Sequence, residues 1–240
     1  MKLSIIYEDD DYIIINKPSG VLSIPDRHNA ELPSVTKVLR DKYASIFIVH
    51  RIDKETSGCI CFAKNEEAHK YASMLFEKRL IEKKYLGIVH GSFDQASGII
   101  EDAIMEHPVI KGKMIINQKQ GKPSTTVYET IANYGTYSLV SFHILTGRTH
   151  QIRLHSANLG HPIVCDALYG LTNPVYISSL KKKYKMSKDI LEETPILNRL
   201  ALHAFSLKFT TAKGKQIVAE APLSKDMDAM LKQCNKWLKQ

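Results

Sequence analysis

Short apolar stretches, many of them alternating or rich in β-branched residues, recur along the chain and predict strands. The first two, residues 5–7 and 12–16, enclose an acidic turn at 9–11 and predict a hairpin that Lys17-Pro18-Ser19-Gly20 closes. The same pattern predicts further strands over residues 46–50, 58–63, 84–90, 99–105, 113–117, 125–131, 137–145, 202–209 and 216–220.

Fewer stretches have the apolar spacing of a helix. One follows Asn65, a suitable N-cap, and places Ala68, Tyr71, Ala72, Leu75 and Phe76 in one stripe. Another begins at Ser224, with a stripe of Met227, Met230, Leu231, Cys234 and Leu238. Shorter or less regular patterns predict helices over residues 34–42, 149–159 (ending before Gly160) and 177–191.

The predicted strands follow one another through short connections, without the strand–helix alternation of a parallel sheet. That order favours an α+β fold with a mixed, mostly antiparallel central sheet and a few packed helices. No Pro/Gly/Ser-rich linker divides the chain, so residues 1–240 are expected to form one domain.

The charge balance adds a first indication of function. The 240 residues contain 33 Lys+Arg and 25 Asp+Glu, a net charge of +8. Such a balance suggests a polyanionic partner, nucleic acid first and an anionic membrane second, although many basic proteins bind neither. Four lysines and no acid lie in residues 111–122, and five lysines lie in residues 181–188. Either run could follow a phosphate backbone or form a solvated face.

Other classes are disfavoured. No apolar run is long enough for a membrane-spanning helix, and the acidic residues 8–11 are wrong for a signal peptide. Four cysteines do not make a secreted disulfide framework, which favours structural thiols in a reducing cytoplasm. Cys59 and Cys61 have no second cysteine pair, so a metal site is not expected. Phosphate-loop, dinucleotide and hydrolase-elbow motifs are missing from the sequence.

Two polar stretches are candidates for chemistry. His50-Arg51-Ile52-Asp53-Lys54-Glu55-Thr56-Ser57-Gly58 is a loop between two predicted strands, a rigid mounting for a reactive group. The neighbouring Arg51 and Lys54 favour an ionised Asp53. On the local sequence alone, an ordinary turn aspartate is the favoured interpretation.

The second stretch is Thr146-Gly147-Arg148-Thr149-His150-Gln151-Ile152-Arg153-Leu154-His155. Thr149 at the expected helix start, with Arg148 and Arg153 close by, suggests an anion site. A solvated basic helix is the alternative. His150 and His155 are five residues apart, which is wrong for a two-histidine metal site on one helical face.

The loop at 50–58 resembles the H-R-L-D-x-x-T-S-G signature of the RluA family of pseudouridine synthases. Four further segments resemble that family's motifs in the same order. They are Asn16-Lys17-Pro18-Ser19-Gly20, Lys84-Tyr85-Leu86 with the strand that follows, the stretch at 146–155 with Gly160-His161-Pro162-Ile163, and Arg199-Leu200-Ala201-Leu202-His203-Ala204. Together they cover nearly the whole chain.

The resemblance implies an RNA-binding cleft and isomerisation of uridine to pseudouridine without a cofactor or metal. Asp53 would be the catalytic aspartate, as nucleophile or base, and Arg153 would pair with it. Tyr85 would stack on the target base, although the residues alone equally allow an inward-facing strand aromatic. Leu202 would pack under the uracil, and Arg51 would fill the gap left by the flipped base or grip its phosphate. Arg148, His150 and Gln151 would contact the substrate.

The chain departs from the family pattern at several places. Ile52 replaces leucine, Cys165 stands where glycine is more common, and residues 171–198 form a longer, lysine-rich insert. The accessory RNA-binding module of many relatives is not expected. The resemblance implies a ribosomal or transfer RNA substrate in the cytoplasm, no membrane partner and a monomer without an obligate protein partner. A non-catalytic RNA-binding or RNA-folding factor is the alternative function.

Overall fold

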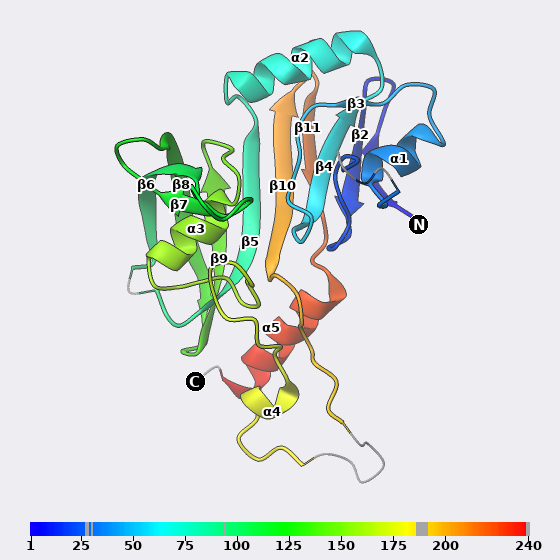
Figure 1. The fold of residues 1–240 in the computed structure, drawn as a ribbon. Helices are drawn as coiled ribbons and strands as arrows, with labels where there is room; N and C mark the ends of the chain where they lie inside the picture. The colour runs from blue at the N-terminus through cyan, green and yellow to red at the C-terminus, as the bar shows by residue number, and fades with distance from the viewer. Residues whose placement is uncertain (27–28, 30, 94, 186–191, 239–240) are drawn as a thin grey trace. The chain divides into compact units, whose positions relative to one another are not determined.

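The computed structural model describes residues 1–26, 29, 31–93, 95–185 and 192–238. The chain forms two compact units (Figure 1). Unit 1 consists of Met1–Tyr85 and His203–Leu223, and unit 2 consists of Leu86–Leu202 and the residues from Ser224 onward. Each unit is therefore assembled from two separate stretches of sequence.

The strands of unit 1 are mostly antiparallel. β1 (Ser4–Glu8) and β2 (Tyr12–Lys17) form the predicted hairpin, and β2 pairs antiparallel with β4 (Ser57–Ala63). β10 (Leu202–Thr210) runs parallel to β4, with Ala204 opposite Gly58. β11 (Gln216–Glu220) and the short β3 (Phe47–Ile48) pair antiparallel with β10 and β4. The sheet is mixed, as the short connections predicted.

Two helices complete unit 1. Ser34 and Asn65 cap α1 (Val35–Arg40) and α2 (Glu66–Glu77), each accepting a hydrogen bond from a backbone N–H three residues ahead. The core combines β2 and β4 with buried residues of both helices and of β10 and β11. Every residue of β4 is buried, including Cys59 and Cys61, whose thiols are free. Burial by apolar neighbours raises the pKa of both thiols, which fits structural cysteines.

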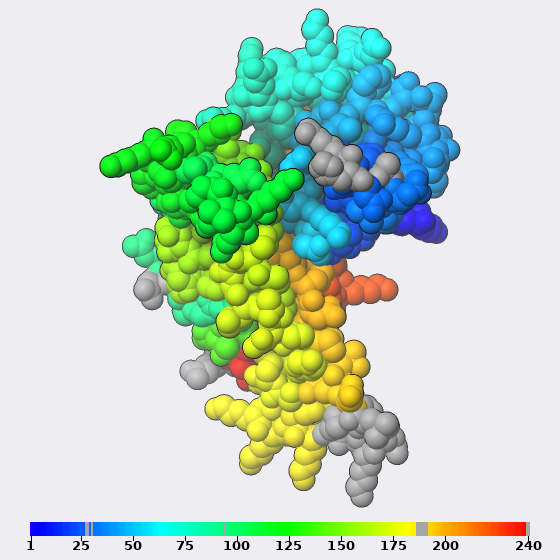
Figure 2. All heavy atoms as spheres, viewed as in Figure 1, coloured from blue at the N-terminus to red at the C-terminus, as the bar shows by residue number. Residues whose placement is uncertain are grey.

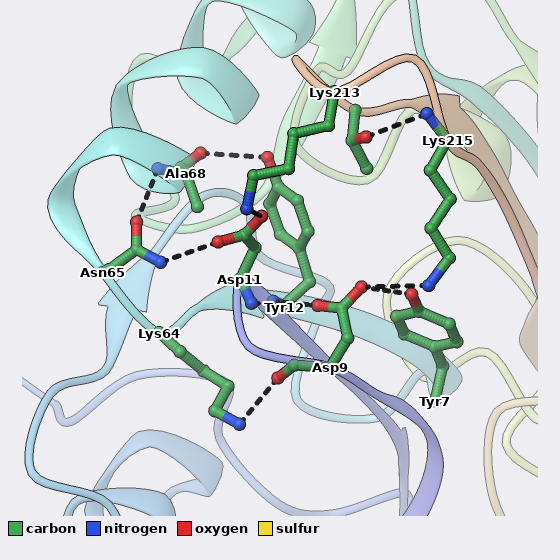
Figure 3. Close-up of polar contacts among 10 residues, drawn as sticks. Tyr7, Asp9, Asp11, Tyr12, Lys64, Asn65, Ala68, Lys213 and Lys215 are labelled. Atoms are coloured by element: carbon green, nitrogen blue, oxygen red, sulfur yellow. Dashed lines mark hydrogen bonds and ion pairs between the residues drawn. The ribbon is translucent and has the colours of Figure 1, made fainter.

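A polar network covers the hairpin turn of unit 1 (Figure 3). Asp9 accepts hydrogen bonds from the Tyr7 hydroxyl and the Tyr12 backbone, and Lys215 Nζ lies 3.4 Å from its Oδ2. Asp11 accepts from Lys213 Nζ at 2.7 Å and from Asn65 Nδ2 at 2.9 Å. Lys64 Nζ donates to Glu8 Oε1 and to the Asp9 carbonyl. We call the side chains of Tyr7, Glu8, Asp9, Asp11, Lys64, Lys213 and Lys215 the hairpin network.

The strands of unit 2 pair antiparallel. β6 (Ser97–Glu106) lies between β7 (Met114–Ile116) and β8 (Lys122–Asn133), and β8 pairs with β9 (Tyr137–Ile144). The chain enters the unit within β5 (Glu82–His90), which neighbours β9. Helix α3 (Gln151–Asn158) contacts β6, β7 and β8.

The insert of unit 2 is anchored at both ends. Val175 and Leu197 are buried and joined by a backbone hydrogen bond of 2.8 Å, and α4 (Ile177–Leu180) packs on α5 (Lys225–Trp237). Arg199 Nε and Nη2 each lie 2.6 Å from an oxygen of Asp226 at the start of α5. The insert is therefore tied to the C-terminal helix.

The sequence predicted the element types well and some boundaries poorly. The α+β class with a mixed, mostly antiparallel sheet is confirmed, while the single-domain prediction is not tested. The helix predicted over 177–191 is wrong over the described residues 181–185, because α4 ends at Leu180 and Lys181 is extended. Like charges four residues apart, as at Lys181 and Lys185, disfavour a helix there. Residues 186–191, including Lys188, lie outside the described residues.

Candidate active site

The loop that carries Asp53 is held through its backbone. The carbonyl of Ile52 accepts from Ser23 Oγ at 2.7 Å, that of Asp53 from the Thr56 N–H, and that of Glu55 from Ser19 Oγ. Ile52 is also buried in the core of unit 1. Hydrogen bonds on three carbonyls and a buried anchor leave this loop little freedom, which is what a precisely placed carboxylate requires.

Lys17 completes this support, a role that no local sequence pattern indicated. Its side chain is fully buried, and Nζ donates to the carbonyls of Pro18, Val21 and Lys54 at 3.0, 2.7 and 2.9 Å. The Lys54 carbonyl also accepts from the Gly20 N–H. The turn at residues 17–20 therefore braces the Asp53 loop across the sheet, and only its place in an ordered motif pointed to it.

The loop ends at a close approach of two strands. Gly58 has φ +109°, and a Cβ there would lie 2.2 Å from the Ala204 carbonyl oxygen, so only glycine fits. Beside it, Ser57 Oγ lies 2.9 Å from Nδ1 of the buried His203. His203 Nε2 lies 3.2 Å from the Ala221 carbonyl, which can only accept. Nε2 therefore carries a proton, and in the neutral ring Nδ1 accepts from the Ser57 hydroxyl.

Two further predicted residues lie in unit 1. Tyr85, on β5, packs against the core of the unit, and burial together with the nearby negative charge of Asp53 raises the pKa of its hydroxyl. The Tyr85 hydroxyl is therefore neutral and interacts electrostatically with the Asp53 carboxylate. Arg51 is exposed beside the buried Ile52.

His50, the first residue of the same motif, has a structural contact. Its Nε2 accepts the Cys61 N–H at 2.9 Å, and its ring stacks on Phe76. Burial, and to a lesser degree the positive charge of Lys83, lowers the pKa of His50 to about 3, so the ring is neutral.

The other predicted residues belong to unit 2, where Arg153 forms a buried ion pair. Its Nε and Nη2 donate to the two oxygens of Asp166 at 2.8 and 2.6 Å, and the two residues are 5% and 0% exposed. Asp166 also accepts the backbone N–H groups of Leu168 and Tyr169. This bidentate pair holds Arg153 rigidly. Its predicted pairing with Asp53 stays a prediction.

The start of α3 is displaced from the expected position. His150 has φ +55°, in the left-handed region, and the helix begins at Gln151, so Thr149 lies before the cap rather than at the helix start. His150 Nδ1 lies 2.9 Å from the Tyr169 hydroxyl, whose oxygen accepts the Met114 N–H at 2.8 Å. The Tyr169 ring lies 5.2 Å from the Arg153 guanidinium. His150 and Arg153 therefore share Tyr169 as a neighbour.

Gln151 supports the loop before the helix. Its Oε1 accepts from Thr146 Oγ1 and from the Arg148 N–H, and its Nε2 donates to the Thr125 carbonyl and Thr126 Oγ1. All four contacts are within hydrogen-bond distance and the side chain is buried. Gln151 thereby fixes the backbone of Arg148, whose own Nε reaches the Pro123 carbonyl at 3.3 Å.

Leu202 lies in an apolar part of unit 2. Its Cδ1 would be 3.6 Å from a Cβ added at Gly87, which would also meet Phe142 and Ile163. The absence of a side chain at Gly87 lets these apolar groups approach β5. Leu202 is 3% exposed, as a residue that packs rather than reacts should be.

The backbone conformation at Cys165 shows why glycine is more common at this position in the family. Its φ of +57° is a left-handed conformation that glycine adopts without strain, so cysteine retains the turn at a conformational cost. The buried thiol lies 3.4 Å from the Asn173 carbonyl and 3.8 Å from the Leu197 carbonyl. The cysteine thus contacts both ends of the insert.

Two classes of feature are missing from the part of the chain that the structure describes. It contains no group of three or more His, Cys, Asp or Glu side chains arranged to hold a metal ion. Its helices include none with the length and apolar character needed to cross a membrane.

Comparisons with known proteins agree with this arrangement. The family model described as RNA pseudouridylate synthase matches residues 11–158, which include the Asp53 loop and Arg153. Ribosomal large subunit pseudouridine synthase D of Nitrosomonas europaea is 33% identical over 95% of this chain, which spans 64% of that protein. Synthase C of Haemophilus ducreyi is 32% identical over 95% of the chain and 68% of the relative.

A solved structure adds the fold. Human RNA pseudouridylate synthase domain containing 1 has a TM-score of 0.70 at 27% identity, covering 98% of this chain and 95% of the human one. The resemblance drawn from the ordered motifs is confirmed by these matches, and the chain belongs to the RNA pseudouridylate synthase family.

Proposed function

We propose that the protein isomerises uridine to pseudouridine in structured RNA, with Asp53 as its catalytic residue. The observation that carries the proposal is the braced loop, in which Lys17, Ser19 and Ser23 bind three of the carbonyls from Ile52 to Glu55. Such bracing is unnecessary for an ordinary turn aspartate, but it suits a carboxylate that must meet one atom of a substrate.

The reaction sets what the other residues must do. The bond between ribose C1′ and uracil N1 breaks and a bond from C1′ to C5 forms, while the C5 hydrogen leaves to solvent and N1 gains a proton. Asp53 would act at the anomeric centre, as nucleophile or as base. A uridine within a stem must first be flipped out, at a cost of a few kcal/mol. Stacking on Tyr85 would return roughly 1–3 kcal/mol.

The remaining assignments follow the same logic. Leu202 would offer the detached uracil an apolar floor on which it can rotate. Arg51 is exposed and would fill the space left in the RNA or bind its phosphate. Arg153 would pair with Asp53, the role that the family resemblance gives it. We propose Gln151 as a positioning residue for Arg148 and His150, since its amide is fully used within unit 2.

Ribosomal RNA is the proposed substrate, because the two curated relatives compared above are named ribosomal large subunit pseudouridine synthases. The chain spans about two thirds of their length. A cytoplasmic location would fit that substrate and the four free cysteines.

Release of tritium from ribosomal RNA labelled at uracil C5 tests the function. We expect release with the unaltered protein and none with Asp53→Asn, whose RNA affinity should stay within a few-fold. A control variant, Asp41→Asn, changes a carboxylate just after α1 and should react normally. Tritium release that survives Asp53→Asn would refute the role of Asp53. RNA binding without any pseudouridine would favour a non-catalytic RNA-binding factor instead.

A further inference from the structure

The insert and the C-terminal helix of unit 2 together form a basic surface outside the motifs. Four lysines follow α4 directly, at 181, 182, 183 and 185, and Lys236 lies in the last turn of α5, on which α4 packs. Lys182, Lys183 and Lys185 are exposed, and side chains of this segment, yellow in Figure 2, project into solvent. We call these five lysines and Trp237 the α4–α5 surface.

Trp237 occupies the centre of this surface. Its ring centroid lies 4.8 Å from Lys181 Nζ and 4.9 Å from Lys236 Nζ, so cations from two separate segments contact one indole. The indole is 39% exposed, and its Nε1 donates to Gln233 at 2.9 Å, which orients the ring. An oriented, accessible aromatic ring beside positive charges is suited to stacking on a nucleobase next to a phosphate.

The described part of the chain offers these lysines no carboxylate partner. Among the described residues, Lys181, Lys182, Lys183, Lys185 and Lys236 make no ion pair. Two acidic side chains of the insert and α5 have other partners, since Asp228 pairs with Lys232 and Glu193 accepts the Ser178 N–H. The surface thus collects positive charge that an external anion would neutralise.

The underlying packing makes the surface persistent. The buried face of α5 consists of Met227, Met230, Leu231 and Cys234, and that of α4 contains Leu180. Arg199 binds Asp226, and the Cys165 thiol contacts the insert. The lysines therefore project from a packed base rather than from an unanchored tail.

We propose that the α4–α5 surface binds the phosphate backbone of the RNA substrate, with Trp237 stacking on an exposed base. This inference rests on the proposed function. It adds an RNA contact on unit 2 that lies outside the motif residues.

An anionic membrane is the competing partner, and the structure favours RNA. An interfacial helix needs an exposed apolar face to insert among lipids. The apolar stripe of α5 is buried instead, and Trp237 is the large exposed apolar residue that this helix presents in the described chain.

Trp237 is the only tryptophan of the sequence, so its fluorescence reports directly on this surface. We expect a ribosomal RNA fragment to quench it, with a midpoint equal to the Kd from filter binding. Quenching should persist in Asp53→Asn. The variant Lys182→Gln/Lys183→Gln should bind RNA about 20-fold more weakly at 0.15 M salt, since each lost phosphate contact costs roughly 4- to 5-fold there. The charge-matched control Lys213→Gln/Lys215→Gln should bind RNA like the unaltered protein.

Each other outcome is decisive. RNA that is bound and modified without quenching Trp237 would overturn the surface and leave the proposed function intact. If the unaltered protein neither binds RNA nor releases tritium, the proposed function itself is refuted. A blue shift with phosphatidylserine vesicles but no response to RNA would assign the surface to membranes. If the lysine variant fails to fold, as circular dichroism would show, the titration of the unaltered protein still decides the question.

Discussion

The hairpin network of unit 1 and the α4–α5 surface of unit 2 are both rich in lysine but use it in opposite ways. In the network, Lys213 and Lys215 each reach an aspartate of the hairpin turn (Figure 3), and Lys64 reaches the Glu8 carboxylate. On the α4–α5 surface, Lys181 and Lys236 lie against the Trp237 indole instead. Lysine is therefore neutralised by carboxylates in one region and presented as positive charge in the other.

The difference shows why net charge is a weak guide to function. The chain carries +8 overall, yet a lysine paired with an aspartate contributes little field beyond a few ångströms. Only charge that the fold leaves uncompensated can attract RNA over a distance. The predictions below test whether pairing decides what a charged residue does.

The largest effect is expected where a pair is buried. Arg153→Met should reduce the free energy of unfolding by about 3–5 kcal/mol, because it leaves the buried Asp166 carboxylate without its cation. Urea unfolding measures this. Arg148→Met, at a partly exposed arginine nearby in sequence, is the control and should cost far less. Equal losses of unfolding free energy in the two variants would show that burial does not determine how much the ion pair contributes to stability.

The salt dependence of RNA binding tests the contrast between the two lysine-rich regions. Lys182→Gln/Lys183→Gln should reduce the slope of log K for RNA against log salt by about 1.5, because two phosphate contacts are lost. Lys213→Gln/Lys215→Gln removes the same charge from the hairpin network and should leave the slope unchanged. Both slopes come from RNA affinities measured between about 0.05 and 0.3 M salt, where counterion release dominates the salt dependence. A similar change in the two variants would mean that net charge, not pairing, controls RNA binding.

Acid should loosen the network and leave the α4–α5 surface unaffected. The Lys64 ammonium lowers the pKa of Glu8, and the Lys213 ammonium lowers that of Asp11. Partial burial opposes ionisation of Asp9, but hydrogen bonds from Tyr7 and two backbone N–H groups still lower its pKa. A carboxyl group with a lowered folded pKa contributes stability above its unfolded pKa, about 4, that is lost as pH falls further.

Unfolding midpoints measured in urea between about pH 5 and pH 2.5 test this acid dependence. Asp9→Asn/Asp11→Asn should flatten the profile, whereas Lys182→Gln/Lys183→Gln should keep its shape. An unchanged profile in the aspartate variant would show that these carboxylates do not govern acid stability.

The smallest effect concerns a single neutral donor. Tyr7→Phe removes the hydroxyl that donates to Asp9, and should reduce the free energy of unfolding by about 1 kcal/mol without altering RNA affinity. Tyr43→Phe removes the equivalent bond to Glu8 and provides the comparison. Thermal unfolding and filter binding measure the two quantities. A loss of RNA binding in Tyr7→Phe would place the hairpin network in RNA recognition, contrary to the assignment made above.

Local features of the fold could be predicted from the sequence. The hairpin before residue 17, the cap at Asn65 and the buried stripe of α5 all depend on residues a few positions apart. The helix expected over 177–191 failed because apolar spacing was weak and the lysines repel one another. The candidate residues were found through the order of five motifs, since no single stretch was specific enough.

The sequence by itself determined the family, the element types and the candidate aspartate, because motifs and short-range periodicity are written in neighbouring residues. Only the tertiary structure decided that Lys17 braces the Asp53 loop, that Gly58 must admit Ala204, and that Arg153 binds Asp166. It also decided which lysines are neutralised. Hydrogen bonds and ion pairs form only between atoms within a few ångströms of each other. Folding brings such atoms together from residues far apart in the chain, and their distance in the sequence does not predict which of them will meet.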